Sequence, residues 1–149
     1  MSLTTSLAAG WLQKHNTSAA EIRDLWLIVE RDLADAASGG ISADWQYGIA
    51  YNAALKLCTI LLYVEGYKPA KGAMAHTRTL NALPYILGSK RQADAEYLEG
   101  CRRKRNTVEY DYAGGASRSD ATELIAFGHE LRSDVLAWLR EKHPGLVPE

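Results

Sequence analysis

Apolar residues recur three and four positions apart along much of the chain, which is the pattern of amphipathic helices. The first such stripe follows Ser18 and consists of Ile22, Leu25, Trp26, Val29, Leu33 and Ala36. Ser18 and Glu21 have the spacing of a capping box, so we expect the helix to begin there. Ser38 and the two glycines after it predict where this helix ends.

A second helix is predicted from about Ala43 to Glu65, where apolar residues cover almost the whole circumference. A helix of this kind lies at the centre of a bundle and is contacted on several sides. Gly48 and the alanines near it are small enough to let another helix approach closely. Asn52 and Lys56 interrupt the apolar run, which is too short and too polar to span a bilayer.

Shorter segments flank this central helix. We expect a short helix over residues 6–15, a loop over residues 66–72, and a short helix or turn over residues 76–84 that ends near Pro84. The glycine and proline residues in these segments mark the boundaries.

Two further long helices are predicted in the second half of the chain. Ser89 and Gln92 form another capping-box pattern, which indicates a helix that lasts until about Gly114. A last helix should start between Ser117 and Asp120 and end just before Pro144. Because no alternating strand pattern is visible, the predicted fold is an all-α bundle of four main helices with an additional short helix. We expect a single domain over residues 1–149.

The composition limits the classes of protein to consider. With 47% apolar residues the chain can bury an ordinary core. A formal net charge of −1 gives no general attraction to nucleic acid, so binding would need a local basic cluster. Two cysteines are too few for a secreted disulfide scaffold, and no signal peptide pattern is present. We therefore expect a cytoplasmic protein that does not enter a membrane.

The four histidines do not form a metal-binding pattern. They are His15, His76, His129 and His143. None is a helical neighbour of another, so we expect neither a metal site nor a cofactor.

Residues 101–112 combine a basic cluster with an apolar stripe. The apolar arc of this helix is formed by Tyr97, Leu98, Cys101, Val108 and Tyr112. At about 100° per residue, Arg105 falls near the middle of that arc, and Arg102 and Glu109 flank it. An arginine in a core-facing stripe is costly unless it is paired or functional. Either Arg105 pairs with Glu109 to seal a helix contact, or it recognises an anion in a cleft or at a dimer interface.

Three features of the chain carry a resemblance to a known family. The first is the central helix with its Ala50-Tyr-Asn-Ala-Ala-Leu sequence, which leads to the Gly66-Tyr-Lys-Pro turn. The second is His76, shortly after that turn. The third is Arg105-Asn106 on the next long helix, ahead of two tyrosines. In these features the chain, over about residues 18–138, resembles the HEPN domains, named for higher eukaryotes and prokaryotes.

The resemblance implies a fold, a site and partners. Active HEPN domains pair an arginine with a histidine four to six residues later, often with a tyrosine two positions further on. They dimerise so that both motifs meet in one RNA-cleaving cleft, and many act as toxins beside a small nucleotidyltransferase antitoxin. By this resemblance the candidate catalytic residues are Arg105, Tyr110 and Tyr112. The candidate binding residues are Arg105, Asn106, Arg102, Glu109 and His76.

The chain departs from the motif at its histidine, where Tyr110 stands instead. RNA cleavage without a metal needs a group that takes a proton from the 2′-hydroxyl, and a phenol with a pKa of about 10 is a poor base. Arginine still recognises phosphate without the histidine. We therefore expect a homodimer that binds RNA, a nucleotide or a partner protein at Arg105 with little or no cleavage. The alternative is a metal-independent endoribonuclease toxin paired with a nucleotidyltransferase antitoxin.

Overall fold

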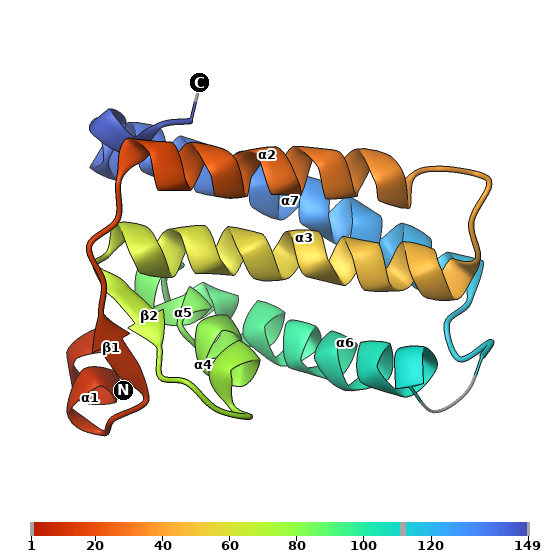
Figure 1. Cartoon of the computed structure of the whole chain (residues 1–149), viewed down its shortest axis with the longest axis horizontal. Helices are drawn as coiled ribbons and strands as arrows, with labels where there is room; N and C mark the ends of the chain where they lie inside the picture. The colour runs from red at the N-terminus through yellow and green to blue at the C-terminus, as the bar shows by residue number, and fades with distance from the viewer. Residues whose placement is uncertain (1, 111–112, 149) are drawn as a thin grey trace.

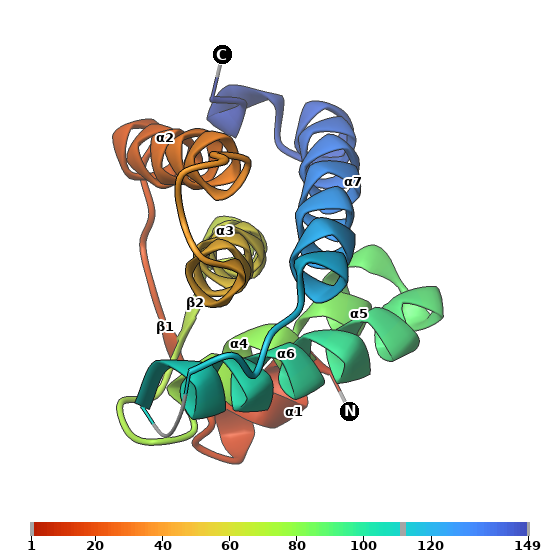
Figure 2. The ribbon, with the colours of Figure 1, turned by 90° about the vertical axis from the view of Figure 1, so that its right-hand side faces the viewer.

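The computed structural model describes residues 2–110 and 113–148 and is mostly helical. Its four long helices are α2 (Ala19–Ala36), α3 (Ala43–Val64), α6 (Gln92–Tyr110) and α7 (Arg118–Lys142). All four were predicted within a few residues of their observed bounds. Viewed end-on, α2, α6 and α7 are arranged around α3 (Figure 2).

Helix α3 provides the centre of the core, as its all-round apolar surface predicts. Its buried side chains include Tyr51, Leu57, Ile60, Leu61 and Leu62. By length and composition α3 is also the one helix in the described part of the chain that could cross a membrane. However, 67% of its most apolar window is buried inside the protein, as in the core helix of a soluble protein.

Serine side chains begin three of the long helices, and Ser18, Ser42 and Ser117 each accept a hydrogen bond from a first-turn amide. Ser117 forms a complete capping box with Asp120. The box predicted at Ser18 is only half formed, because the Glu21 carboxylate instead accepts hydrogen bonds from Thr17 and pairs with His15.

The capping box predicted at Ser89 is absent. Ser89–Arg91 form the 3₁₀ turn η1 without a side-chain cap, and α6 begins one residue later at Gln92. The Gln92 amide donates to Glu96 within the helix instead of reaching back to its start.

A two-stranded antiparallel sheet corrects the expectation that no strand would occur. Helix α1 (Leu3–Ala8) is shorter and earlier than the helix predicted over residues 6–15. A turn with Gly10 at φ +80° leads into β1 (Leu12–Lys14), which pairs with β2 (Tyr67–Pro69) inside the predicted loop. Three residues are too few to display an alternating pattern, so the sequence did not reveal either strand. The sheet and α1 lie beside the end of α3 where that helix stops (Figure 1).

Two short helices connect the sheet to α6. They are α4 (Ala75–Asn81) and α5 (Leu83–Leu87), followed by η1. Pro84 lies in the first turn of α5 and does not end a helix there, because a missing amide hydrogen is harmless at that position. A second 3₁₀ turn, η2 (Pro144–Leu146), follows α7. Helix α4 contacts both α3 and α6, and this contact creates the candidate site.

Candidate functional site

A hollow of about 410 Å³ lies between α4 and the second half of α6. We call it the basic hollow. It is lined by Gly72, Ala73, Ala75, His76, Arg102, Arg105, Asn106 and Tyr110. No carboxylate lines it among the residues that the structure describes.

Glu99 fixes the two walls of the basic hollow relative to each other. Its Oε1 accepts a hydrogen bond of 2.8 Å from Arg102 Nε on the same helix, and its Oε2 accepts one of 3.1 Å from Thr77 Oγ1 on α4. Because Thr77 follows His76 directly, this contact sets the position of the histidine. Glu99 thus holds α4 against α6 and orients Arg102 at the same time.

The far end of α6 is tied to other elements. Lys104 Nζ donates to Asp120 Oδ2 at 2.6 Å, which joins α6 to the start of α7. That lysine and Ser117 lower the pKa of Asp120 to about 2. Asp44, at the start of α3, accepts hydrogen bonds from the backbone amides of Gly114 and Ala116. The Lys104 contact thus holds α6 against α7, and the Asp44 contacts hold the segment just before α7.

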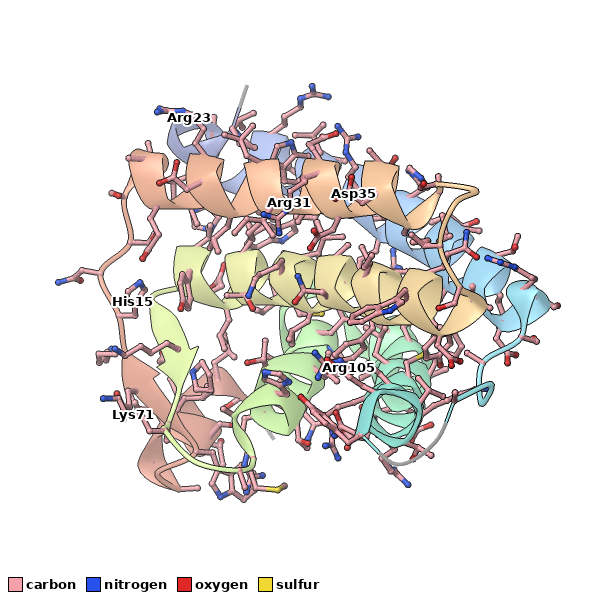
Figure 3. The ribbon with its side chains drawn as sticks, turned by 45° about the vertical axis from the view of Figure 1, so that its right-hand side comes forward. His15, Arg23, Arg31, Asp35, Lys71 and Arg105 are labelled. Atoms are coloured by element: carbon pink, nitrogen blue, oxygen red, sulfur yellow. The ribbon has the colours of Figure 1, made fainter. Side chains whose placement is uncertain are left out.

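Arg105 is partly buried between α3, α4 and α6 (Figure 3). Its Nε is buried and lies 2.8 Å from Glu109 Oε2, but the N–H is not directed at that oxygen, so the contact is an ion pair without a hydrogen bond. Arg105 Nη1 donates to Asn106 Oδ1 at 3.3 Å. Its guanidinium carbon is 5.9 Å from the centre of the Tyr51 ring, within range of a cation–π contact.

The structure contains the Arg105–Glu109 pair that was one of the two interpretations. The Arg105 side chain faces inward and is 24% exposed, so part of it is accessible to solvent. Recognition of an anion by Arg105 stays a prediction.

His76 stands in an electropositive setting. Its pKa is lowered from the usual 6.5, first by loss of solvent and then by the positive charges of Arg105, Lys56 and Arg102. The neutral imidazole is therefore the main form near pH 7, and it has a nitrogen that can accept a proton.

A second cavity of about 500 Å³ lies between α2, α3 and α6 and is also lined by Arg105. We call it the inner cavity. Its lining residues are Asp32, Ser42, Asp44, Trp45, Gly48, Ile49, Asn52, Arg105, Val108, Glu109 and Ala113. Asn52 Nδ2 donates to the buried Asp32 carboxylate at 2.5 Å, which closes one end of the cavity.

The structure brings most of the predicted site residues together. His76, Arg102, Arg105, Asn106 and Tyr110 all line the basic hollow, although the roles assigned to them stay predictions. Glu109 lines the inner cavity instead. Tyr112 lies outside the described residues.

Apart from Arg105 and Glu109, the residues of the inner cavity were not identified as site residues from the sequence. Asp32 could have been recognised in the sequence, because it is a charged residue within the apolar stripe between Val29 and Leu33. The sequence contains no such indication for Trp45, because a tryptophan on an apolar helix is expected in the core, yet this one is largely exposed. Asn52, which interrupts the apolar run of the central helix, forms a hydrogen bond across the bundle to Asp32 on α2.

Comparison of the chain with protein-family models, curated proteins and solved structures gave no match. The site is therefore described from this chain alone. Among the described residues, no group of three His, Cys, Asp or Glu side chains could hold a metal ion.

The half-open Arg105–Glu109 pair predicts a small stability loss for Arg105→Ala. With Glu109 30% exposed, its released carboxylate can be hydrated, so we expect a loss below about 2 kcal/mol in urea unfolding. Leu57→Ala in the α3 core is the reference and should cost about 2–5 kcal/mol. A loss of about 3–5 kcal/mol for Arg105→Ala would instead identify a buried structural pair.

Proposed function

We propose that this chain is a divergent HEPN-like domain that binds RNA or a nucleotide through phosphate in the basic hollow. One observation carries the proposal: His76, Arg102, Arg105 and Asn106 come from two helices and line one open hollow. The resemblance had named these four residues as binding residues, together with Glu109, which lines the inner cavity instead.

The chemistry of the basic hollow suits a phosphate group. An arginine stays charged at any relevant pH and offers five N–H donors in a planar fork. Glu99 occupies the Nε side of Arg102, which leaves the remaining donors of that guanidinium available. Asn106 accepts from Arg105 through Oδ1, so its amide nitrogen is free to donate to a phosphate oxygen.

The resemblance also supports a symmetric dimer in which two basic hollows face each other, with a nucleotidyltransferase as a further partner. In a two-fold dimer the same surface of each copy forms the interface. Light scattering at micromolar concentration should give twice the 16.4 kDa chain mass. A monomer under these conditions would remove the shared cleft from the proposal.

If the basic hollow recognises phosphate, the affinity for short single-stranded RNA should fall as the salt concentration rises. Fluorescence anisotropy measures this affinity. Arg102→Ala and Arg105→Ala should each weaken binding by about tenfold or more, since each removes a charged phosphate donor. Arg23→Ala, an exposed arginine on α2, is the matched control and should leave the affinity unchanged. In Figure 3 Arg23 and Arg105 are well separated. Equal losses in all three variants would indicate only non-specific attraction.

The position of His76 favours a second candidate function, the metal-independent endoribonuclease. The family motif places its histidine on the arginine's own helix, where this chain has Tyr110. His76 lies in the basic hollow from α4 instead, and it is mainly neutral near pH 7. A neutral imidazole beside two arginines is a suitable group to accept a proton from a 2′-hydroxyl.

For this candidate we expect slow cleavage of single-stranded RNA that chelators do not inhibit and that His76→Gln abolishes. Because His76 must be unprotonated, the rate should rise with pH and level off above a pKa that is lower than 6.5. Gel analysis across pH 4.5–8 measures both properties. Loss of cleavage in Tyr110→Phe but not in His76→Gln would assign the proton transfer to the tyrosine. No cleavage at any pH would leave binding as the function.

A further inference from the structure

The inner cavity and the basic hollow differ in charge and share one wall. The inner cavity is lined by the carboxylates of Asp32, Asp44 and Glu109 and by a single cation, Arg105. The basic hollow is lined by Arg102, the same Arg105 and His76. A ligand that extends across Arg105 would therefore meet acceptor groups on one side and cationic groups on the other.

Apolar and aromatic side chains complete the inner cavity. Ile49 and Val108 contribute to its walls, and Trp45 lies at its edge with 60% of its surface exposed. A large aromatic residue that is left exposed beside a cavity offers a flat face for a planar ligand. The volume of about 500 Å³ is within the usual range for a small-molecule site.

The three carboxylates of the inner cavity are not equivalent. Asp44 accepts from two backbone amides, and Asp32 is buried and bonded to Asn52 and Arg31. Glu109 is paired with Arg105 but remains 30% exposed. Because a carboxylate has about four acceptor positions, Glu109 can still accept hydrogen bonds from a ligand.

We propose that the inner cavity holds the base of a guanine nucleotide, stacked on Trp45 and read by Glu109, while its phosphate occupies the basic hollow. This inference rests on the proposed function and names the ligand class of the same site. A mononucleotide carries its base and its phosphate on one sugar, which suits two pockets that share Arg105 in their lining.

Guanine fits the acidic cavity best because of its hydrogen-bond donors. Its pairing edge has a ring N–H beside an amino group, and an ionised carboxylate only accepts hydrogen bonds. Adenine and cytosine have one amino group each without that neighbouring ring N–H, and uracil has a ring N–H between two carbonyl groups. Two adjacent donors facing Glu109 should therefore select guanine over the other bases.

The test is calorimetric titration of the full chain at low salt with GMP, AMP, CMP, UMP and inorganic phosphate. GMP should bind at least about tenfold more tightly than the other nucleotides. Glu109→Gln should reduce GMP binding to the level of the others while inorganic phosphate still binds. Glu141→Gln, an exposed glutamate on α7, is the matched control and should change nothing.

Trp45→Ala separates stacking from phosphate recognition. It should weaken all four nucleotides by about tenfold and leave inorganic phosphate unchanged, because stacking does not depend on base identity. Leu27→Ala, 59% exposed on α2, is its control. A short RNA that contains one guanine is then tested for its ability to displace bound GMP. Displacement shows that the inner cavity accepts a guanine within an RNA strand, and its absence shows that it accepts only the free nucleotide. Either result supports the inference.

Two results would overturn the inference in different ways. Equal affinity for all four nucleotides, lost in Arg105→Ala but not in Glu109→Gln or Trp45→Ala, would reject the guanine pocket and retain phosphate binding. No Arg105-dependent binding of inorganic phosphate or any nucleotide would reject both the guanine pocket and the proposed function.

Discussion

A helix that is apolar on every side must be covered on every side, and α3 imposes this requirement on the rest of the chain. Helices α2, α6 and α7 are arranged around it, and the short helix α4 also contacts it (Figures 1 and 2). Burial of its side chains against these helices is a large part of the apolar burial that drives folding. The cover is not continuous, and both the inner cavity and the basic hollow lie where α6 approaches α3 and α4.

Arg105 connects the core to these two spaces. Gly48 on α3 faces it, and a methyl group at that glycine would lie 3.9 Å from Arg105 Cγ. Glu109 partly neutralises the arginine from the side of the inner cavity, while Glu99 holds Arg102 and α4 on the other side. The site is therefore arranged mainly by carboxylates that sit behind the arginines, which leaves positive charge directed into the basic hollow.

The sequence predicted the long helices because each has many residues with a clear period and recognisable caps. It also predicted that Arg105 faces inward, because one charged residue within an apolar arc stands out. The β1–β2 sheet could not be found, since three-residue strands show no period and depend on pairing across about fifty residues of chain. The resemblance named both His76 and Arg105, but the contact that holds their helices together, in which Glu99 bridges Thr77 and Arg102, has no sequence pattern. The exposure of Trp45 was equally hidden, because an aromatic residue on an apolar helix is normally assigned to the core.

The proposed function depends on one interaction, in which Arg105 presents its guanidinium to a phosphate-bearing ligand while His76 lies in the same hollow. The most direct test is NMR of the arginine Nε–H and histidine ring signals during titration with GMP. The Arg105 Nε–H and the His76 ring signals should shift together and saturate with the same affinity, while the Arg23 and His129 signals stay unchanged. Saturable binding that leaves both the Arg105 and His76 signals unmoved would show that the ligand binds elsewhere.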